Sequence, residues 1–534
     1  MAPPDQQAAG HRRTVFGPTI DSIERELLPA LGGGVLEPER EAMVRSSVGR
    51  LLMQFGDWES GLEQLERAVD QLPERSVPRA ASLLWLGWPY GSPRPASWHL
   101  DQVRRALAAT PDDLPAADRL MLDRLYVTRL LFLGDAAGWD LLDRIPDRAD
   151  EQDVALQAVL AHADLAYAAL LWGRYRQADH HVQITGRLSE RWYFEGFTDA
   201  LESTVVHLDW CLGRWEGLFE RALALTTTGH DRFARQESLL VTTKLARACG
   251  LTERAGTDPE LLLSEMLPHE APELLALAAT EAAERHLERG DVDEAVRVTE
   301  EAAAEVLASA NWLSATEIVP GRVEVLVAAG RADEAEELAA GLARLAGEPV
   351  PQLVEAALAW CHGLLSEQRD PVAAADHFRG TTGLLIALTR PYDVARVRIR
   401  RADCLLRVED REGAVAELRS ARTGLAELRA WPLVADVEAR LARLGVRGAG
   451  TSGRRAYGEE LSPRERDVVR LVAQGRTNRQ IAQELVLSSK TVANHVATAR
   501  RKLRAPSRTA LAVTAIAAGL IEHPAEERSR GERG

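Results

Sequence analysis

Residues 461–521 contain a series of helix-start signals; they read LSPRERDVVRLVAQGRTNRQIAQELVLSSKTVANHVATARRKLRAPSRTALAVTAIAAGLI. Ser462-Pro463-Arg464-Glu465 has the pattern of a capping box, with proline in the first helical turn. Thr477-Asn478-Arg479-Gln480 repeats that pattern soon after Gly475, a residue that suits the end of the preceding helix. The segment therefore predicts two short helices in succession.

Two further helices are expected, from Ser488 to about Arg504 and from Ser507 to Gly519. A tight turn at Val486–Ser488 separates the second helix from the third, which is the pattern of a helix-turn-helix. Lys490–Arg504 is then the element offered to a DNA major groove. The apolar side chains expected to close one small core are Val469, Val472, Ile481, Ala482, Leu485, Leu487, Val492, Val496 and Leu503.

The same segment also differs from the rest of the chain in net charge. Leu461–Pro524 holds eleven Lys or Arg against four Asp or Glu, a balance of +7. The whole chain carries −15 and the tail from Ala525 is neutral, so residues 1–460 carry −22. A basic module on an acidic body is typical of a protein that binds phosphates through that module.

These residues resemble the C-terminal DNA-binding domain of LuxR-type transcriptional regulators over about sixty positions. The motifs that carry the resemblance are L-S-P-R-E-R at 461–466, Gly475 with Asn478, I-A-x-x-L at 481–485, L-S at 487–488, T-V-x-N-H-V at 491–496, K-L at 502–503 and S-R-T at 507–509. The resemblance implies binding of double-stranded promoter DNA, as a homodimer formed through the fourth helix.

Carried over by position, the resemblance implies phosphate contacts from Thr491 and Lys502, with Lys490 and His495 added. The resemblance implies that Ala493, Asn494 and Ala497 face base edges, so only Asn494 can hydrogen-bond a base, with adenine as the expected base. Specificity is then expected to depend also on Arg500, on DNA shape or on tandem sites. The full predicted interface is Lys490, Thr491, Ala493, Asn494, His495, Ala497, Arg500, Arg501, Lys502 and Arg508.

The part of the chain that precedes this segment has the pattern of a helical repeat. A helix that ends at a small residue, followed by a turn and a new amphipathic helix, recurs with a period of 39–40 residues. The copies begin at Gly56, Gly134, Gly173, Gly213, Gly290, Gly330, Arg369 and Glu409, with degenerate copies expected at Gly91 and Gly250. The glycines suit a helix end at positive φ. Alanines at a constant offset, for close helix packing, are Ala178, Ala295, Ala335, Ala374 and Ala414.

The predicted fold is therefore all-α: a right-handed α-solenoid of tetratricopeptide-like helix pairs, followed by a small four-helix helix-turn-helix domain. The period also resembles the repeats that precede the LuxR-type domain in large ATP-dependent, MalT-like regulators. No G-x-x-x-x-G-K-[ST] occurs in this sequence, so the NTPase of those regulators is not expected. The expected domains are a disordered lead at 1–20, the solenoid at 21–444, a linker at 445–460, the DNA-binding domain at 461–522 and a disordered tail at 523–534.

Trp85, Trp88, Tyr90 and Trp98 form the densest aromatic cluster, in a segment broken by proline and glycine. We predict an effector-binding surface there; the alternative is that large aromatic side chains wedge helix pairs apart. The four cysteines show no C-x-x-C spacing and are expected to be reduced, buried thiols.

The sequence predicts a bacterial, cytoplasmic, nucleoid-associated transcription factor. No secretory signal, transmembrane segment, metal site, cofactor motif or catalytic triad is found, so an enzyme is not expected. The solenoid would act as a sensor or would dock RNA polymerase or another protein. The alternative is an interaction scaffold, with the helix-turn-helix serving only as a tether.

Overall fold

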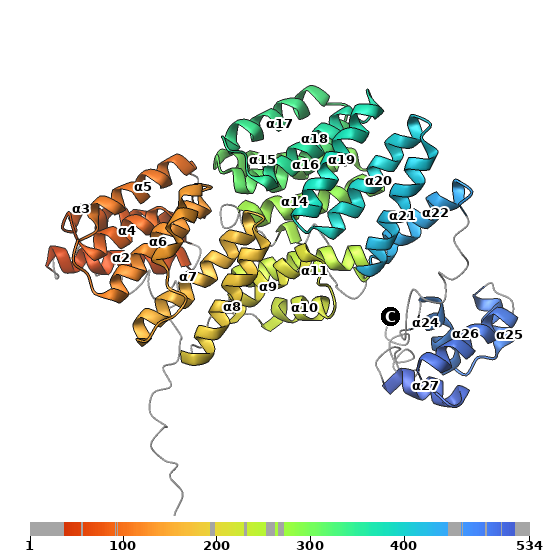
Figure 1. Ribbon diagram of the computed structural model, residues 1–534. Coiled ribbons are helices and arrows are strands. Elements are labelled where there is room, and N and C mark those ends of the chain that lie inside the picture. Colours follow the sequence, from red (N-terminus) through yellow and green to blue (C-terminus); the bar gives the residue numbers. More distant parts are fainter. Residues whose placement is uncertain are drawn as a thin grey trace, which may run out of the picture. The chain divides into compact units, whose positions relative to one another are not determined.

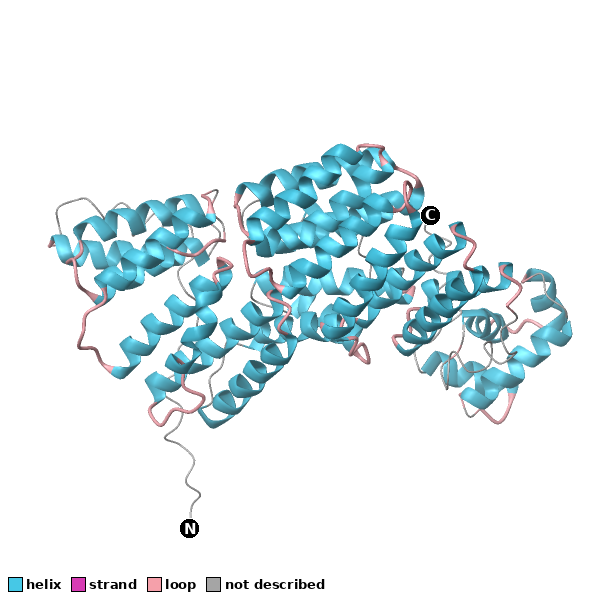
Figure 2. Cartoon of the chain, turned by 45° about the horizontal axis from the view of Figure 1, so that its top comes forward, coloured by secondary structure: helices cyan, strands magenta, loops and turns pink. Residues whose placement is uncertain are grey.

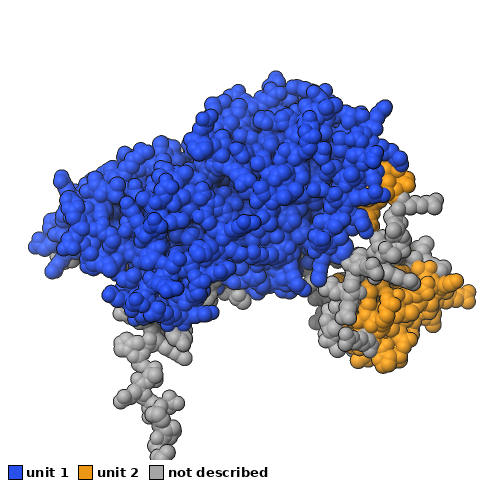
Figure 3. Space-filling view, in the orientation of Figure 1, with its two compact units in different colours: residues 1–437 blue, residues 438–534 orange. Residues whose placement is uncertain are grey.

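The computed structural model describes residues 37–54, 57–90, 92, 94–192, 198–228, 232–252, 262–264, 272–446, 461, 463–485, 489–503 and 505–517. The chain forms two compact units, Met1–Val437 and Glu438–Gly534 (Figure 3). Several predicted features lie outside the described residues: the lead at 1–20, most of the linker at 445–460, the tail at 523–534, Gly56, Gly91, Ser462 and the turn at 486–488.

Helices are the regular structure of the part that is described (Figure 2), as the predicted all-α class requires. The first half of unit 1 holds α2 (Pro38–Gln54), α3 (Trp58–Gln71), α4 (Val77–Leu86), α5 (Ala96–Ala109), α6 (Ala116–Phe132), the 3-10 helix η2 (Ala136–Arg144), α7 (Gln152–Leu171), α8 (Tyr175–Trp192), α9 (Thr198–Leu212), α10 (Leu218–Thr228) and α11 (Arg232–Cys249). The second half holds α14 (Pro272–Arg289), α15 (Val292–Ala308), α16 (Trp312–Ala328), α17 (Ala332–Ala346), α18 (Gln352–Ser366), α19 (Pro371–Ala387), α20 (Pro391–Arg407), α21 (Arg411–Glu427) and the first residues of α22 (Trp431–Arg443), a helix that continues into unit 2. Successive helices pack side by side as hairpins (Figure 1), so the predicted solenoid of tetratricopeptide-like pairs is confirmed.

The repeat pattern has the structural basis expected from the sequence. Gly134, Gly173, Gly213, Gly290 and Gly330 have φ between 70° and 83°, where a side chain would be strained. The alanines at the constant offset are all fully buried, which allows close packing of the second helix of each pair: Ala178, Ala295, Ala335, Ala374 and Ala414. One copy differs from the prediction, since the element after Gly134 is the short 3-10 helix η2.

The first half of the solenoid packs against the second half, a feature that the repeat pattern does not predict. A Cβ at Gly134 would lie 2.3 Å from the indole nitrogen of Trp312, and one at Gly213 would lie 2.6 Å from Pro391. A Cβ at Gly173 would lie 3.2 Å from Leu388 and 3.4 Å from Leu353, and one at Gly250 would lie 3.3 Å from Pro432. Each of these glycines has a partner about 180 residues downstream, so successive turns of the first half meet successive helices of the second.

Trp312 and Asn311 anchor this contact between the halves. The Trp312 indole N–H donates to the carbonyl of Gly134 at 3.0 Å, and the Asn311 side-chain amide donates to the carbonyl of Phe132 at 2.8 Å. Trp172 meets Trp312 edge to face, with ring centroids 4.8 Å apart. The turn after α6 is thereby held by side chains from the start of α16.

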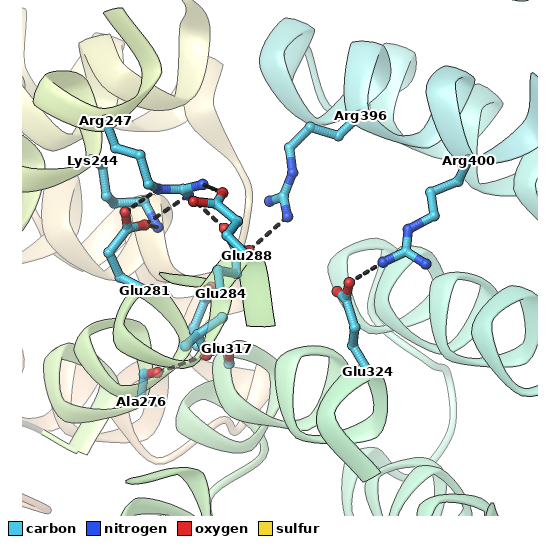
Figure 4. A network of polar contacts seen from close by, with 11 residues as sticks. Lys244, Arg247, Ala276, Glu281, Glu284, Glu288, Glu317, Glu324, Arg396 and Arg400 are labelled. Carbon is cyan, nitrogen blue, oxygen red and sulfur yellow. Dashed lines mark hydrogen bonds and ion pairs between the residues drawn. The ribbon is translucent and has the colours of Figure 1, made fainter. Parts of the chain in front are cut away.

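Ion pairs add a second link, shown in Figure 4. Arg247 of α11 pairs with Glu281 and Glu284 of α14, and Arg396 of α20 reaches Glu284 with an N–O distance of 2.6 Å. Arg400 of α20 pairs with Glu324 of α16. Burial would raise the pKa of Glu284, but the charges of Arg396 and Arg247 outweigh it and lower that pKa to about 2. The Glu284 carboxylate therefore remains ionised at neutral pH.

Helix α7 is long and apolar enough to span a membrane by length and composition alone. In the fold, 67% of that apolar window is buried, as in the core helix of a repeat protein. It packs between α6 and α8 (Figure 1).

A buried carboxyl group lies where the two halves join. Glu273, at the start of α14, is 1% exposed and accepts a hydrogen bond from the Tyr167 hydroxyl at 2.9 Å. Burial raises the pKa of Glu273 to about 7, and the nearby charge of Glu237 adds to that shift.

We expect this carboxyl group to make the stability of unit 1 depend on pH. Between its ordinary pKa of 4.5 and about 7, Glu273 holds a proton in the folded chain that the unfolded chain has lost. The free energy of unfolding should therefore fall as the pH rises through this window. Glu273→Gln keeps an acceptor for Tyr167 and should flatten that part of the profile. Calorimetry of both chains between pH 5 and about pH 8 tests this; parallel profiles would contradict it.

Candidate nucleic-acid interface

The described residues of unit 2 after 462 form α24 (Pro463–Ala473), α25 (Asn478–Glu484), α26 (Ser489–Lys502) and α27 (Arg508–Ala517). Two local signals are confirmed at the second helix. Thr477 and Gln480 form a reciprocal capping box, and Gly475 has φ 79°. The hydroxyl of Ser507 accepts from the N–H of Ala510 at 3.0 Å, as expected for the cap of the last helix.

The predicted core of this unit is also confirmed where it is described. Val469, Ile481 and Val492 are fully buried, and Leu485 and Leu503 pack against the same cluster at partial burial. Val492 and Val496 fix the buried face of α26. Leu487 lies outside the described residues.

The opposite face of α26 is open to solvent along one stripe. Its exposed side chains are Lys490, Ala493, Asn494, Ala497 and Arg501. These positions follow the i, i+3, i+4, i+7, i+11 spacing of a single helix face. Two alanines at the centre allow another surface to approach the helix backbone closely, while a lysine and an arginine stand at the two ends.

Thr491 and His495 lie at the margin of this stripe, both half-buried. They border the exposed face without standing at its centre. Their predicted phosphate contacts remain predictions.

Two arginines of the predicted DNA interface form hydrogen bonds within unit 2. The Arg500 guanidinium donates to the carbonyls of Ala505 and Pro506, which fixes the turn between α26 and α27. Arg508 donates to the Asn478 side chain at 2.7 Å and to the carbonyl of Arg476. Their donors therefore orient neighbouring segments, a role that the charge pattern does not reveal.

Lys502, also predicted to contact a phosphate, lies in a buried ion pair. Its ammonium pairs with the Glu465 carboxylate at 2.7 Å, and the two side chains are only 5% and 7% exposed. A phosphate needs an accessible cation, whereas this one is enclosed between α24 and α26. Lys502 thus holds α26 on α24 rather than presenting a charge to solvent.

Three exposed arginines outside α26 were not singled out from the sequence: Arg470, Arg476 and Arg479. Arg476 and Arg479 flank Thr477, the residue that caps α25. Basic side chains beside a helix N-terminus, where unpaired backbone N–H groups gather, suit phosphate binding. Their position around a capping box is the signal that could have identified them.

The predicted effector cluster in unit 1 packs into the fold. Tyr90 is 5% exposed, and Trp85, Trp88 and Trp98 lie half-buried against the core of the first repeats. The guanidinium of Arg129 stacks over Trp88, 4.0 Å from the ring centroid. A cavity beside Tyr90, also lined by Arg94, His99 and Asn311, has a volume of about 10 Å³. That is room for about one water molecule.

Comparisons with known proteins concern mainly unit 2. The family model described as bacterial regulatory proteins, luxR family (GerE), matches residues 459–515. The spore germination protein GerE of Bacillus subtilis is 40% identical over 62 residues, which are 12% of this chain and 84% of that protein. A putative HTH-type transcriptional regulator of Mycobacterium tuberculosis, Rv0890c, is 47% identical over 66 residues, again 12% of this chain but only 8% of that protein.

For the helical body, one similar solved structure is a Rap protein complexed with competence and sporulation factor. It is 14% identical, the match covers 76% of this chain and all of that one, and the TM-score is 0.44.

Proposed function

Since the chain belongs to the luxR family of bacterial regulatory proteins through its C-terminal unit, we propose that it is a sequence-specific DNA-binding regulator of transcription, not an enzyme. It would act in the cytoplasm on promoter DNA. The observation that carries this proposal is the exposed stripe of α26, from Lys490 to Arg501.

The stripe has the composition of a major-groove reader. Asn494 is its one uncharged hydrogen-bonding side chain, and an amide of this kind can bond both N6 and N7 of adenine. Ala493 and Ala497 beside it are small enough to allow the helix deep into the groove, where they can contact thymine methyl groups. Lys490 and Arg501 would bind phosphates at the two ends.

Further phosphate contacts would come from Arg476 and Arg479 at the start of α25. A homodimer would place two such heads on one duplex, and Val513 of α27, which is 61% exposed, supports dimer contact through that helix. Arg500, Arg508 and Lys502 would contribute indirectly, by holding α26 and α27 in place.

The solenoid would act as a sensor or protein-docking platform that regulates the DNA-binding head, residues 461–522. RNA polymerase is among the candidate partners. Because the cavity at Tyr90 holds no more than a water-sized molecule, the outer surface of the helix pairs is better suited than that cavity to receive a partner. The aromatic cluster at 85–98 would bind an effector only if this segment opened.

We expect Asn494→Ala to reduce selectivity without abolishing DNA binding. Losing one bidentate amide–adenine contact should lower discrimination against the wrong base by about 1–3 kcal/mol. Lys490→Ala and Arg501→Ala should instead weaken binding to all duplexes and lower the slope of log K against log salt by about 0.9 each. Selection of the full chain on random duplexes, followed by salt titration, measures both effects and the number of chains bound.

Arg419→Ala is the matched control, because Arg419 is exposed on α21 and its loss removes the same charge from unit 1. It should leave both selectivity and salt slope unchanged. If the wild-type chain binds all duplexes equally and Asn494→Ala changes nothing, the regulator proposal fails and the scaffold alternative is favoured.

A further inference from the structure

A fully buried arginine lies against the aromatic cluster of the first repeats. Arg129 of α6 is 1% exposed, and its guanidinium carbon lies 4.0 Å from the ring centroid of Trp88 and 5.5 Å from that of Trp85. Burial lowers the pKa of Arg129 to about 9, so the side chain is still a cation at neutral pH. A charge at this depth ordinarily needs a partner of opposite sign, because its transfer out of water is costly.

The other two buried arginines of the described chain have such a partner. Arg45 pairs with Glu41 at 2.6 Å, and Arg322 pairs with Glu300 at 3.5 Å. Arg129 is the most deeply buried of the three, yet no carboxylate of the described residues forms an ion pair with it. Its charge is balanced only by the faces of the neighbouring indole rings.

The hydrogen-bond donors of Arg129 are also incompletely used. Its Nε donates to the carbonyl of Leu84 at 3.2 Å, and its Nη1 donates to the hydroxyl oxygen of Thr128 at 3.4 Å. A guanidinium has five N–H groups, and two are used here, so three have no acceptor among the described residues. These donors form a planar fork that matches the two oxygens of a carboxylate.

The surroundings of Arg129 favour a ligand with one negative charge and an apolar body. Arg124, earlier on the same helix, is paired with Asp164 at 2.9 Å and does not supply a second free charge for a dianion. Trp85 and Trp88 are half-buried, so a movement of their rings would admit a ligand from solvent. The same rings would then pack against the apolar part of that ligand.

We propose that Arg129 binds the carboxylate of a small apolar effector whose body packs against Trp85 and Trp88. This proposal names a ligand class for the sensor role of the solenoid and rests on that role. One turn after Arg129, the carbonyl of Phe132 accepts a hydrogen bond from Asn311 at 2.8 Å, so the site adjoins the contact between the two halves. The test measures ligand binding without DNA, so this proposal can fail while the DNA-binding proposal stands.

The first test is calorimetric titration of the full chain with benzoate at constant ionic strength. Benzoate should bind with a Kd of about 1 mM or tighter. Benzyl alcohol, which has a similar size but no charge, should bind at least about tenfold more weakly, and so should inorganic phosphate. The proposal is overturned if benzoate does not bind, or if either of the other two binds as tightly as benzoate; this comparison requires no variant.

Arg129→Met removes the charge and keeps a long apolar side chain. It should weaken benzoate binding at least about tenfold, whereas Arg419→Met, at an exposed position on α21, should leave the Kd unchanged. Arg129→Lys keeps the charge but lacks the planar fork, and it should also bind benzoate more weakly than wild type. Thermal unfolding followed by tryptophan fluorescence identifies any variant that no longer folds. A folded chain with either substitution at Arg129 that binds benzoate as tightly as wild type would also overturn the proposal.

Discussion

Replacing Gly134 by alanine should destabilise unit 1 by about 3–5 kcal/mol, since three costs add at this turn. The backbone has φ 77°, where a side chain costs roughly 1 kcal/mol or more. The new Cβ would lie 2.3 Å from the Trp312 indole nitrogen, so the ring must move. Moving it breaks the hydrogen bond from Trp312 to the Gly134 carbonyl and disturbs the edge contact with Trp172. Chemical denaturation followed by tryptophan fluorescence measures the change.

Gly330→Ala separates backbone strain from the contact between the halves. Gly330 ends the equivalent helix of a later repeat with φ 76°, but no heavy atom lies within 4 Å of the position a Cβ would take. It should cost only the strain of the left-handed region, about 1 kcal/mol. Equal losses for the two variants would mean that the first half does not press on Trp312 in solution.

The repeat architecture could be predicted because its signals are local. A glycine at a helix end, a short turn and an alanine at a fixed offset all lie within one repeat, as at Gly173 and Ala178. Other turns lack the glycine. Thr389, Glu409 and Arg429 have φ between 57° and 63° without being glycine, so tertiary packing overrides local preference there.

The packing of the first half of the solenoid against the second half could not be predicted, because its contacts join residues about 180 positions apart. Nothing in the sequence around Trp312 indicates that its indole N–H will meet the carbonyl of Gly134. The aromatic cluster at 85–98 shows the same limit: a density of tryptophan and tyrosine is compatible with a binding surface or with a core, and the structure buries Tyr90.

At the DNA-binding head the sequence predicted the recognition helix, its buried face and its exposed positions. It could not distinguish cations that face solvent from cations used inside the fold. Lys490 and Lys502 look alike in the sequence. In the structure Lys490 is exposed, whereas the side chain of Lys502 is only 5% exposed and forms an ion pair. That distinction depends on Glu465, 37 residues earlier, being buried at the same place.

We expect Glu465→Gln to unfold the DNA-binding unit. Removing one member of a buried ion pair leaves the other charge without compensation, at a cost of about 3–5 kcal/mol. A core built from about sixty residues rarely supplies more than that. All twelve tryptophans precede residue 438, so their fluorescence reports unit 1 alone and should not change. Hydrogen exchange of peptides from 463–517, followed by mass spectrometry, should show the loss of protection.

Lys502 is the other member of this buried ion pair. Lys502→Ala should abolish DNA binding by unfolding the head, which would resemble the loss of a phosphate contact. The double variant Glu465→Leu with Lys502→Met resolves the ambiguity, because replacing both members of a buried pair by apolar residues of similar size is often neutral or stabilising. If the pair is structural, the double variant should regain protection from exchange and bind DNA with the wild-type salt slope. If it folds but its salt slope falls by about one, Lys502 contacts a phosphate in the complex, and the pair must open on binding.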